Sequence, residues 1–336
     1  MKVLKTIACV LAGVFLFFFV INVIPPKKSA EENPFLVEAG ALPMIAAHRG
    51  GGACNPENTL LAFYEAVDIY GVDILEGDLH LTKDGHLVFN HDDYIDETCN
   101  VNGDISFSEV RSLCSEKKNR HYVSDMTLEE LRTYNFGYYF TDKNGKRPYK
   151  EVANAAEMGL QIATLEQVFD AFYESDPALL FIVEIKDGGE RGAEACRALD
   201  ALLEKYPNYR DRIVVGSFFS SVEKTLKESY PDIYRGASTV MAANFIVTQT
   251  LRVNLFSEDN FHCLQIPASF NLGVGKLGLA KETYVDRAHE RNIAVQYWID
   301  NDEDTVRRLI EIGCDCIMTD DPAFLKKIFE EYQSAQ

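Results

Sequence analysis

The chain has 336 residues, of which 47% are hydrophobic and 25% are charged, enough for one large domain with a sizeable core. Its formal net charge is −19. A field of that sign argues against nucleic acid as a partner and disfavours anionic membrane surfaces. An anionic substrate would need positive charge supplied locally, and a bound cation is one way to supply it. No obligate protein partner is inferred.

Residues 1–30 differ from the rest and are predicted to be a membrane anchor with its flanks. Lys2 and Lys5 precede an apolar run, Thr6–Ile24. The run has about 19 residues, close to the ~20 that cross a bilayer. A cleaved signal peptide is the alternative, which the bulky residues at the cleavage position disfavour. The flanking lysines barely decide orientation. We expect a single-pass protein of the cell membrane whose C-terminal domain is extracytoplasmic.

From Leu42 onward, short apolar runs alternate with stretches of helical period, as in a parallel sheet wrapped by helices. The predicted strands are Met44–His48, Val72–Leu79, Leu180–Lys186, Ile213–Ser217, Tyr234–Ser238, Cys263–Ile266, Ala294–Trp298 and Cys316–Thr319. The predicted helices are Asn58–Tyr70, Thr164–Glu174, Arg191–Lys205, Val222–Ser229, Met241–Leu255, Lys281–Arg291, Asp304–Ile312 and Pro322–Tyr332. This alternation predicts an α/β fold, a (β/α)8 TIM barrel over residues 43–332. A doubly wound open sheet is the alternative.

One stretch breaks the alternation, because a second strand follows Val72–Leu79 after only a short turn. The turn Lys83-Asp84-Gly85 is far too short for a crossover helix, so Leu87–His91 is predicted to return antiparallel as a hairpin. A hairpin centred between the last two turn residues pairs Asp78 with His91. It would deliver that histidine to the barrel mouth.

Residues 98–151 are a second irregularity. The segment is polar and rich in turn residues, and it carries two short helical pieces, Ser106–Leu113 and Thr127–Tyr134. We predict an insertion on the active-site face that contributes shape rather than barrel framework.

Three carboxylates fall at predicted strand ends. Glu76 and Asp78 are two residues apart, so both point the same way in a strand, and Glu184 lies at an equivalent level. Carboxylates on one face repel unless a cation or a proton lies between them. Three hard oxygen ligands without a thiolate suit Mg²⁺ or Ca²⁺ better than zinc. Structural ion pairs with arginines are the alternative, which the trio disfavours.

Two histidines accompany these carboxylates. A phosphodiester needs a base to activate the attacking oxygen and an acid to protonate the leaving alkoxide, and histidine suits both near neutral pH. His48 and His91 are placed to face the metal from two sides, and Asp92 or Asp93 is placed to orient His91.

Positive charge is available beside them. Arg49 can engage two phosphate oxygens at once, and Lys186 supplies a second cation. Glycines 50–52 let backbone approach an anion closely, although such a triplet also marks any loop.

Five blocks of sequence carry a family resemblance. In chain order they are IAAHRGGGACNPENTLLAF, LEGDLHLTKDGHLVFNHDD, VEIK, VQYWIDN and IMTDDP. Over roughly Met44 to Phe329, their order and spacing resemble the glycerophosphodiester phosphodiesterase family, here as a membrane-anchored bacterial-type member. The resemblance implies a TIM barrel, one divalent cation, and hydrolysis of glycerophosphodiesters to glycerol 3-phosphate and an alcohol.

The resemblance also implies roles for individual positions. It makes His48 and His91 the catalytic acid–base pair, Glu76, Asp78 and Glu184 the metal ligands, Arg49, Lys186 and Trp298 the substrate contacts, and Glu57, Asn58 and Asp92 supporting residues. One departure stands out: an acid, within Asp96-Glu97-Thr98, replaces an arginine that the family usually has before Thr-Thr-Asn. With the longer insertion, it leaves the head-group alcohol open.

Three other functions stay open at this point. Related barrels act on intact lipid, so phospholipase D-like action on (lyso)phospholipid is one, and an exposed apolar rim in residues 98–151 would favour it. A glycerophosphate polymer is the second. The third is a non-catalytic binding barrel, whose mark would be a lost histidine or carboxylate, and none is lost.

Overall fold

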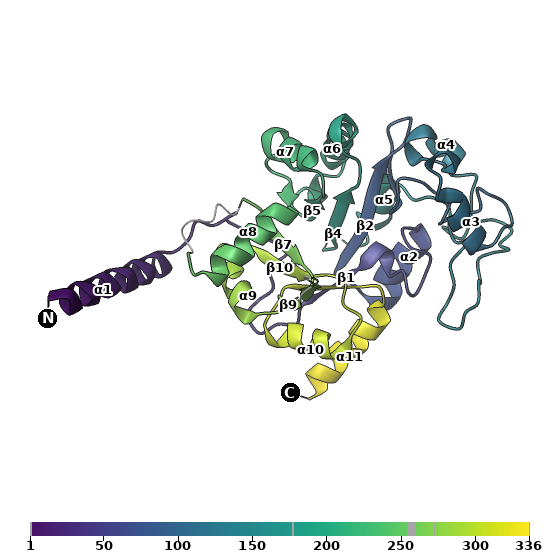
Figure 1. Cartoon of the computed structure of the whole chain (residues 1–336). Helices are drawn as coiled ribbons and strands as arrows, with labels where there is room; N and C mark the ends of the chain where they lie inside the picture. Colours follow the sequence, from purple (N-terminus) through teal and green to yellow (C-terminus); the bar gives the residue numbers. More distant parts are fainter. Residues whose placement is uncertain (1, 177, 254–259, 272, 274, 336) are drawn as a thin grey trace.

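The centre of the computed structural model is a barrel of parallel strands (Figure 1). The model describes the chain apart from residues 1, 177, 254–259, 272, 274 and 336. Within the described part, the barrel strands are β1 (Met44–Ala47), β2 (Ile74–Leu81), β4 (Leu180–Ile185), β5 (Ile213–Gly216), β6 (Tyr234–Arg235), β7 (Cys263–Ile266), β10 (Ala294–Tyr297) and β11 (Cys316–Thr319). All eight were expected from the sequence; β7 and β11 have the predicted bounds, and the ends of the others differ by at most three residues.

The sheet closes on itself. Its order is β6-β5-β4-β2-β1-β11-β10-β7, and a parallel bridge from Gly236 to Cys263 joins the last strand to the first. The Ala237 amide donates to the carbonyl of Cys263 at 2.8 Å, and the His262 amide donates to the carbonyl of Arg235 at 2.8 Å. This closure confirms the TIM barrel and excludes the doubly wound open sheet.

Helices surround the strands on all sides (Figure 1). They are α2 (Leu60–Glu65) with a π-helical continuation (Ala66–Tyr70), α5 (Leu165–Phe172), α6 (Gly189–Lys205), α7 (Ser220–Ser229), α8 (Thr239–Thr250), α9 (Glu282–His289), α10 (Glu303–Glu311) and α11 (Pro322–Ser334). Several begin at a capping side chain; the Thr164 hydroxyl, for example, accepts from the Gln167 amide at 3.1 Å. Asn58 was expected to begin α2, but Thr59 caps that helix instead.

The N-terminal end of the barrel is sealed by the segment that precedes β1. Phe35 is fully buried in the apolar layer inside the barrel, among side chains such as Ala46, Ile74 and Val214. Asn33 Nδ2 donates to the carbonyls of His262 and Asn292 at 2.9 and 3.0 Å. These contacts fix the segment to the loops that enter the strands.

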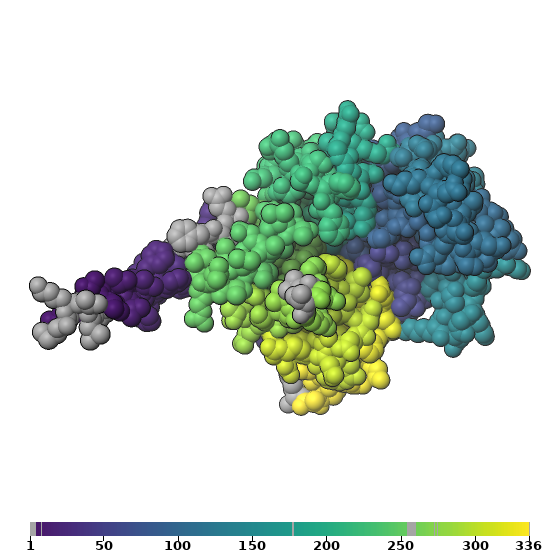
Figure 2. Space-filling model, in the orientation of Figure 1, coloured from purple at the N-terminus to yellow at the C-terminus, as the bar shows by residue number. Residues whose placement is uncertain are grey.

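Ahead of this segment stands α1 (Lys2–Val23), which projects away from the barrel in Figures 1 and 2. Its stretch Lys5–Val23 is long and apolar enough to cross a membrane, a test that a signal sequence also passes. The helix meets the domain at Asn22, whose Nδ2 donates to the carbonyl of Arg252 at 2.9 Å. Arg287 donates to the side-chain oxygen of Asn22 at 3.2 Å.

The predicted hairpin is present, but its register differs by one residue from the expected one. β3 (Leu87–Phe89) runs antiparallel to β2 with Leu79 opposite Phe89, so Asp78 lies opposite Asn90 and not His91. The cause is the three-residue loop, in which Gly85 adopts φ +88°. A loop with an odd number of residues centres the hairpin on its middle residue, which moves every pair by one.

The insertion has a small core of its own. It carries α3 (Phe107–Cys114) and α4 (Leu128–Leu131), and buried side chains such as Ile95, Val123 and Leu131 pack together beneath them. Tyr149 Oη donates to Asn55 at 3.2 Å, in the loop that follows β1. That loop leaves the carboxyl end of a barrel strand, so the insertion lies on the predicted face.

A second, smaller hairpin also stands at the mouth. β8 (Ser269–Asn271) and β9 (Lys276–Gly278) pair antiparallel in the loop that follows β7.

Candidate active site

His48 lies in the tight turn that follows β1. Its Nδ1 is 2.6 Å from Asp320 Oδ1, and its Nε2 is 4.0 Å from Glu76 Oε2. Burial acts to lower the pKa of His48, but the hydrogen bond to Asp320 and the charge of Glu76 outweigh it and raise the pKa above its usual value. The carboxylate of Asp320 therefore fixes the ring and favours its protonated form.

Arg49 holds the turn against the carboxylates of β2. The residue has a left-handed φ of +52°, which its neighbours impose: its amide donates to Glu76 Oε2 at 2.8 Å, and its Nε lies 3.0 Å from Asp78 Oδ2. Nη1 donates to Glu57 at 3.0 Å. The guanidinium thus joins two carboxylates, the backbone amide holds a third, and the side chain stays partly open to solvent.

The three predicted ligands lie on two adjacent strands. Asp78 in β2 lies directly opposite Glu184 in β4, and Glu76 is two residues back on the same face. Lys186 Nζ bridges the pair, at 3.0 Å from Asp78 Oδ1 and 2.9 Å from Glu184 Oε2. Asn58, which has a φ of +58°, donates to Asp78 Oδ2 at 3.3 Å.

The two buried carboxylates of β2 differ in their charge state. Burial and the adjacent charge of Asp78 raise the pKa of Glu76 to about 7. Burial acts the same way on Asp78, but Lys186 and Arg49 outweigh it and hold the pKa of that carboxyl below its usual value. Two carboxylates close together in a low dielectric do not both ionise easily, so their pKa values move apart. Asp78 is ionised, whereas the pKa of Glu76 lies close to neutral pH.

His91 reaches the site from the hairpin. It follows Asn90, whose amide donates to the carbonyl of Asp78 at 2.9 Å, and the hairpin is seated by Phe89, whose ring covers Gly77. Its charge helps to lower the pKa of Asp78, so the ring lies within electrostatic range of that carboxylate. Asp92 Oδ1 lies 3.0 Å from His91 Nδ1, as expected of an orienting carboxylate. Unlike His48, His91 is well exposed to solvent.

A model of the glycerophosphoryl diester phosphodiesterase family matches residues 48–324. The chain belongs to this family. A glycerophosphodiester phosphodiesterase of Caldanaerobacter subterraneus is 27% identical over 282 residues, covering 84% of this chain and 96% of that protein. A human lysophospholipase D is 24% identical over 306 residues and 86% of each chain. The predicted family and enzyme class are therefore confirmed.

Solved structures confirm the fold. The glycerophosphoryl diester phosphodiesterase domain of a Mycobacterium tuberculosis protein aligns with a TM-score of 0.65 at 19% identity, over 85% of this chain and 99% of that domain. An Oleispira antarctica phosphodiesterase, solved with the product sn-glycerol-3-phosphate, aligns with a TM-score of 0.61 at 21% identity, over 86% of this chain and 97% of that chain.

In this family member, one network of contacts links six of the predicted residues: His48, Arg49, Glu76, Asp78, Glu184 and Lys186. Their individual roles stay predictions. Asp320 is a residue that the sequence reasoning missed. It lies in the block IMTDDP, after β11, and it is the direct partner of His48. Asn301 Nδ2 in turn donates to Asp320 Oδ2 at 2.9 Å. The adjacency of β1 and β11 in a closed barrel was the available signal.

The three predicted ligands, Glu76, Asp78 and Glu184, have the chemistry of a divalent-cation site but do not converge closely enough to surround an ion. Among the described residues, no three Asp, Glu, His or Cys side chains converge closely enough to hold an ion as they stand. Lys186 and Arg49 already lie against Asp78, and a cation would compete with them for its oxygens. The set itself, two carboxylates in register and a third two residues back on the same face, has the hard oxygen chemistry of Mg²⁺ or Ca²⁺.

The other arc of the mouth carries several exposed apolar side chains. Trp298 and Ile299 follow β10, Phe270 lies in the small hairpin after β7, and Phe218 and Phe219 follow β5; all five side chains are exposed. Together with β6, which lies between β5 and β7, these strands form one continuous arc of the barrel, opposite the charged arc of β1, β2, β4 and β11. Trp298 thus lies at the mouth, as expected of an aromatic residue near the pocket.

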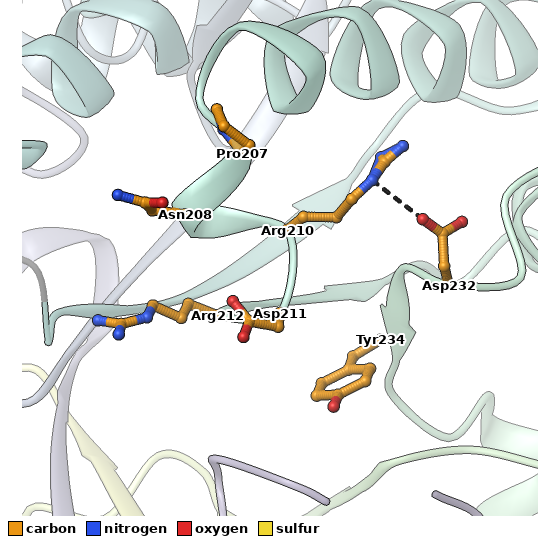
Figure 3. A pocket seen from close by; sticks show the side chains of 7 residues that line it. All are labelled: Pro207, Asn208, Arg210, Asp211, Arg212, Asp232 and Tyr234. Atoms are coloured by element: carbon orange, nitrogen blue, oxygen red, sulfur yellow. Dashed lines mark ion pairs between the residues drawn. The ribbon is translucent and has the colours of Figure 1, made fainter.

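A hollow of about 470 Å³ lies away from this chemistry (Figure 3). It is lined by Pro207, Asn208, Arg210, Asp211, Arg212, Asp232 and Tyr234. These residues precede β5 or begin β6, so they lie at the end of the barrel opposite to the one that carries catalysis in this fold. Arg210 is paired with Asp200 and Asp232, which gives the hollow a structural ion-pair network.

Proposed function

We propose that this family member hydrolyses glycerophosphodiesters to glycerol 3-phosphate and an alcohol at the charged arc of the mouth. One observation carries the proposal: two histidines flank a cluster in which Arg49 and Lys186 meet buried carboxylates. Two cations beside two titratable rings are the groups that a phosphodiester anion and its leaving oxygen need. The family match and the relatives support the same substrate class.

The proton transfers divide between the histidines. An oxygen nucleophile attacks phosphorus and loses its proton to one imidazole, while the bond from phosphorus to the alcohol oxygen breaks and the other imidazole protonates that oxygen. His48 is buried and held by Asp320, whereas His91 is exposed at the rim beside Asp92. An exposed donor on a hairpin is suited to a leaving group that departs toward solvent.

A divalent cation, Mg²⁺ or Ca²⁺, is proposed for the same site. Glu76, Asp78 and Glu184 would hold it. When bound, it supplies positive charge against the oxygens of the phosphate. Lys186 Nζ now bridges Asp78 and Glu184; with those carboxylates holding a cation, its ammonium would be free to turn to the substrate.

A substrate panel tests the proposal. The full chain in detergent is given glycerophosphocholine, glycerophosphoethanolamine and glycerophosphoglycerol with Mg²⁺ or Ca²⁺, and glycerol 3-phosphate is measured. We expect its release, its loss with EDTA, and its recovery when the ion returns. Release of phosphocholine in place of choline would contradict the bond assignment. Full activity after exhaustive chelation would remove the cation from the mechanism.

Lysophospholipase D action is a second candidate, favoured by the apolar arc of the mouth. The expected apolar rim was to lie in residues 98–151, where α3 exposes Phe107 and Leu113. The larger set lies instead on the other arc, around Trp298 and Phe270. The human relative named lysophospholipase D supports such a substrate. Choline release from lysophosphatidylcholine, compared with glycerophosphocholine, separates the two candidates.

We also propose that α1 is an uncleaved single-pass anchor with the barrel outside the cytoplasm. Ile21 is buried, and Asn22 is hydrogen-bonded through its nitrogen to Arg252, just after α8, and through its oxygen to Arg287 of α9. A segment destined for removal has no need of such contacts. Mass determination of the membrane-extracted protein tests this, because the intact chain retains all of α1.

A further inference from the structure

The outer face of α8 lacks the charged residues that a solvent-exposed helix face usually carries. The helix has no charged residue from Thr239 to Thr250, in a chain of net charge −19. Its inner face, with Ala242 and Phe245, is buried in the core. Its outer face is uncharged and carries two large exposed aliphatic side chains, Val240 at 79% and Val247 at 55% exposure, beside the exposed polar residues Thr239, Asn244 and Thr250. An exposed helix face with large aliphatic side chains and without a charge is suited to an apolar neighbour.

This apolar face continues past the end of the helix to the anchor. Leu251, one turn after Val247, is 61% exposed, and the next residue, Arg252, accepts the hydrogen bond from Asn22 of α1. Positions 240, 247 and 251 lie on one side of the helix, because their spacings are close to whole numbers of turns. The stripe therefore ends where the candidate membrane span begins.

At its other end the stripe meets the apolar arc of the mouth. α8 follows β6, and the strands on either side of β6 are β5 and β7. The loops after these strands carry the exposed rings of Phe218, Phe219 and Phe270, and Trp298 follows the next strand, β10. Figure 1 shows α8 on the side of the barrel from which α1 departs, and in Figure 2 its outer side is uncovered.

We infer that the outer face of α8 and the apolar arc of the mouth together form a bilayer-contact surface, on which the barrel lies on its side. The occupant is the lipid of the membrane that holds α1. An uncharged stripe is the part of this acidic chain that anionic head groups would not repel. Resting on the proposed function, the inference also names the substrate class: lipid phosphodiesters, such as lysophospholipids, that enter the site from the bilayer.

The length of the linker is consistent with this orientation. Five residues, 24–28, separate α1 from Ser29, whose amide donates to the carbonyl of Arg291 at the N-terminal end of the barrel. Five extended residues reach at most about 17 Å. The 17 residues of α6, which spans the barrel from mouth to base, extend about 25 Å. The linker is therefore too short for the mouth to face the bilayer directly. A barrel that lies with its axis along the membrane plane is the arrangement that brings the rim of the mouth to lipid.

Trp298 tests the surface directly, because it is the only tryptophan in the chain. The full chain is reconstituted in vesicles of phosphatidylcholine and phosphatidylglycerol, with or without bromine on the acyl chains. We expect brominated lipid to quench Trp298 emission, and Val247→Asp with Leu251→Asp to restore most of the signal. Phe107→Asp with Leu113→Asp, on exposed positions of α3 across the barrel, is the matched control and should leave quenching unchanged.

Equal Trp298 emission in both lipids would overturn the inference whatever the enzyme does. A cross-link between the α8 helices of two chains, without quenching, would overturn it in favour of a second copy. Thermal unfolding of the variants in detergent checks that the exposed substitutions leave the fold intact, and the wild-type measurement is decisive alone.

Activity in the same vesicles tests the substrate class. We expect the α8 pair of substitutions to slow hydrolysis of embedded lysophosphatidylcholine by about tenfold, the effect of losing one to two buried aliphatic contacts, while dissolved glycerophosphocholine is turned over as before. Equal slowing of both substrates would overturn entry from the bilayer. If the wild type cleaves neither, the proposed function fails, and quenching still decides the surface.

Discussion

The two ends of the barrel bury polar groups in opposite ways. At the base, Asp315 is fully buried and fully used: it accepts from the amides of Val37 and Val295, and it pairs with His289. At the mouth, Glu76 and Asp78 are buried side by side, and each depends on cations from other strands. The buried charge at the base is fully satisfied and stabilises the fold. At the mouth, two carboxylates are buried next to each other, an arrangement that costs stability and is therefore expected to serve function.

His91→Ala should give the largest effect on activity. It should also show most clearly that a residue at the mouth matters for catalysis and not for stability. If the histidine is an acid or base, kcat should fall by roughly 10²- to 10⁴-fold, while its exposed position leaves the unfolding midpoint nearly unchanged. The readouts are product release and thermal unfolding. His86→Ala, an exposed histidine on the same hairpin, is the control. Retained activity in the variant would remove His91 from catalysis.

Phe35→Ala should do the reverse at the base. Removal of this fully buried ring is expected to lower the free energy of unfolding by about 3–5 kcal/mol, because it leaves a cavity inside the barrel. kcat of the folded fraction should stay close to that of the wild type. Chemical denaturation measures the first quantity and steady-state kinetics the second. A loss below about 1 kcal/mol would show that the segment does not seal the barrel.

His262, also at the base, gives that end a dependence on acid. Burial, helped by the charge of Arg235, lowers its pKa to about 4, below the value of an unfolded histidine. The unfolded chain therefore takes up a proton first, and stability is full above about pH 6.5 and falls as the pH drops to about 4. The loss should reach up to about 3 kcal/mol.

His262→Gln removes this titration and keeps an acceptor for the Arg235 amide. Unfolding by denaturant, repeated between pH 7.5 and 4, should therefore show a smaller loss in the variant. Identical slopes would mean that His262 is not the group responsible.

Asp320→Asn should have the smallest of these effects. It tests whether a buried carboxylate at the mouth acts on catalysis through His48. The amide keeps the shape but loses the charge that orients His48 and raises its pKa. We expect kcat to fall roughly tenfold to a hundredfold with KM little changed. The pH–rate profile should shift to lower pH for the group that His48 contributes, a change that a merely structural role would not cause. Asn301→Ala, one contact further out, should do less.

Much of the fold could be read from the chain, because each strand and helix carries a local signal. All eight barrel strands and the helices between them show the periodicity of their elements. The hairpin was also predictable, since its turn was too short for any helix. Its register was not, because a shift of one residue depends on whether the loop closes on two or three residues.

At the site, the residue types were predictable and their pairings were not. His48, Glu76, Asp78 and Glu184 stand at strand ends in the sequence itself. That Lys186 bridges Asp78 and Glu184, or that Asp320 holds His48 from the far end of the chain, follows only from which strands become neighbours.

The same division holds for the bilayer-contact surface. The sequence by itself predicted a helix over Met241–Leu255, which has no charged residue before Arg252, and an apolar span at the N-terminus. Only the tertiary structure decided that the two meet at Asn22 and that the apolar loops gather on the same side of the mouth. Hydrophobic pattern is a local property of the chain, whereas the face that stays exposed depends on how the barrel closes.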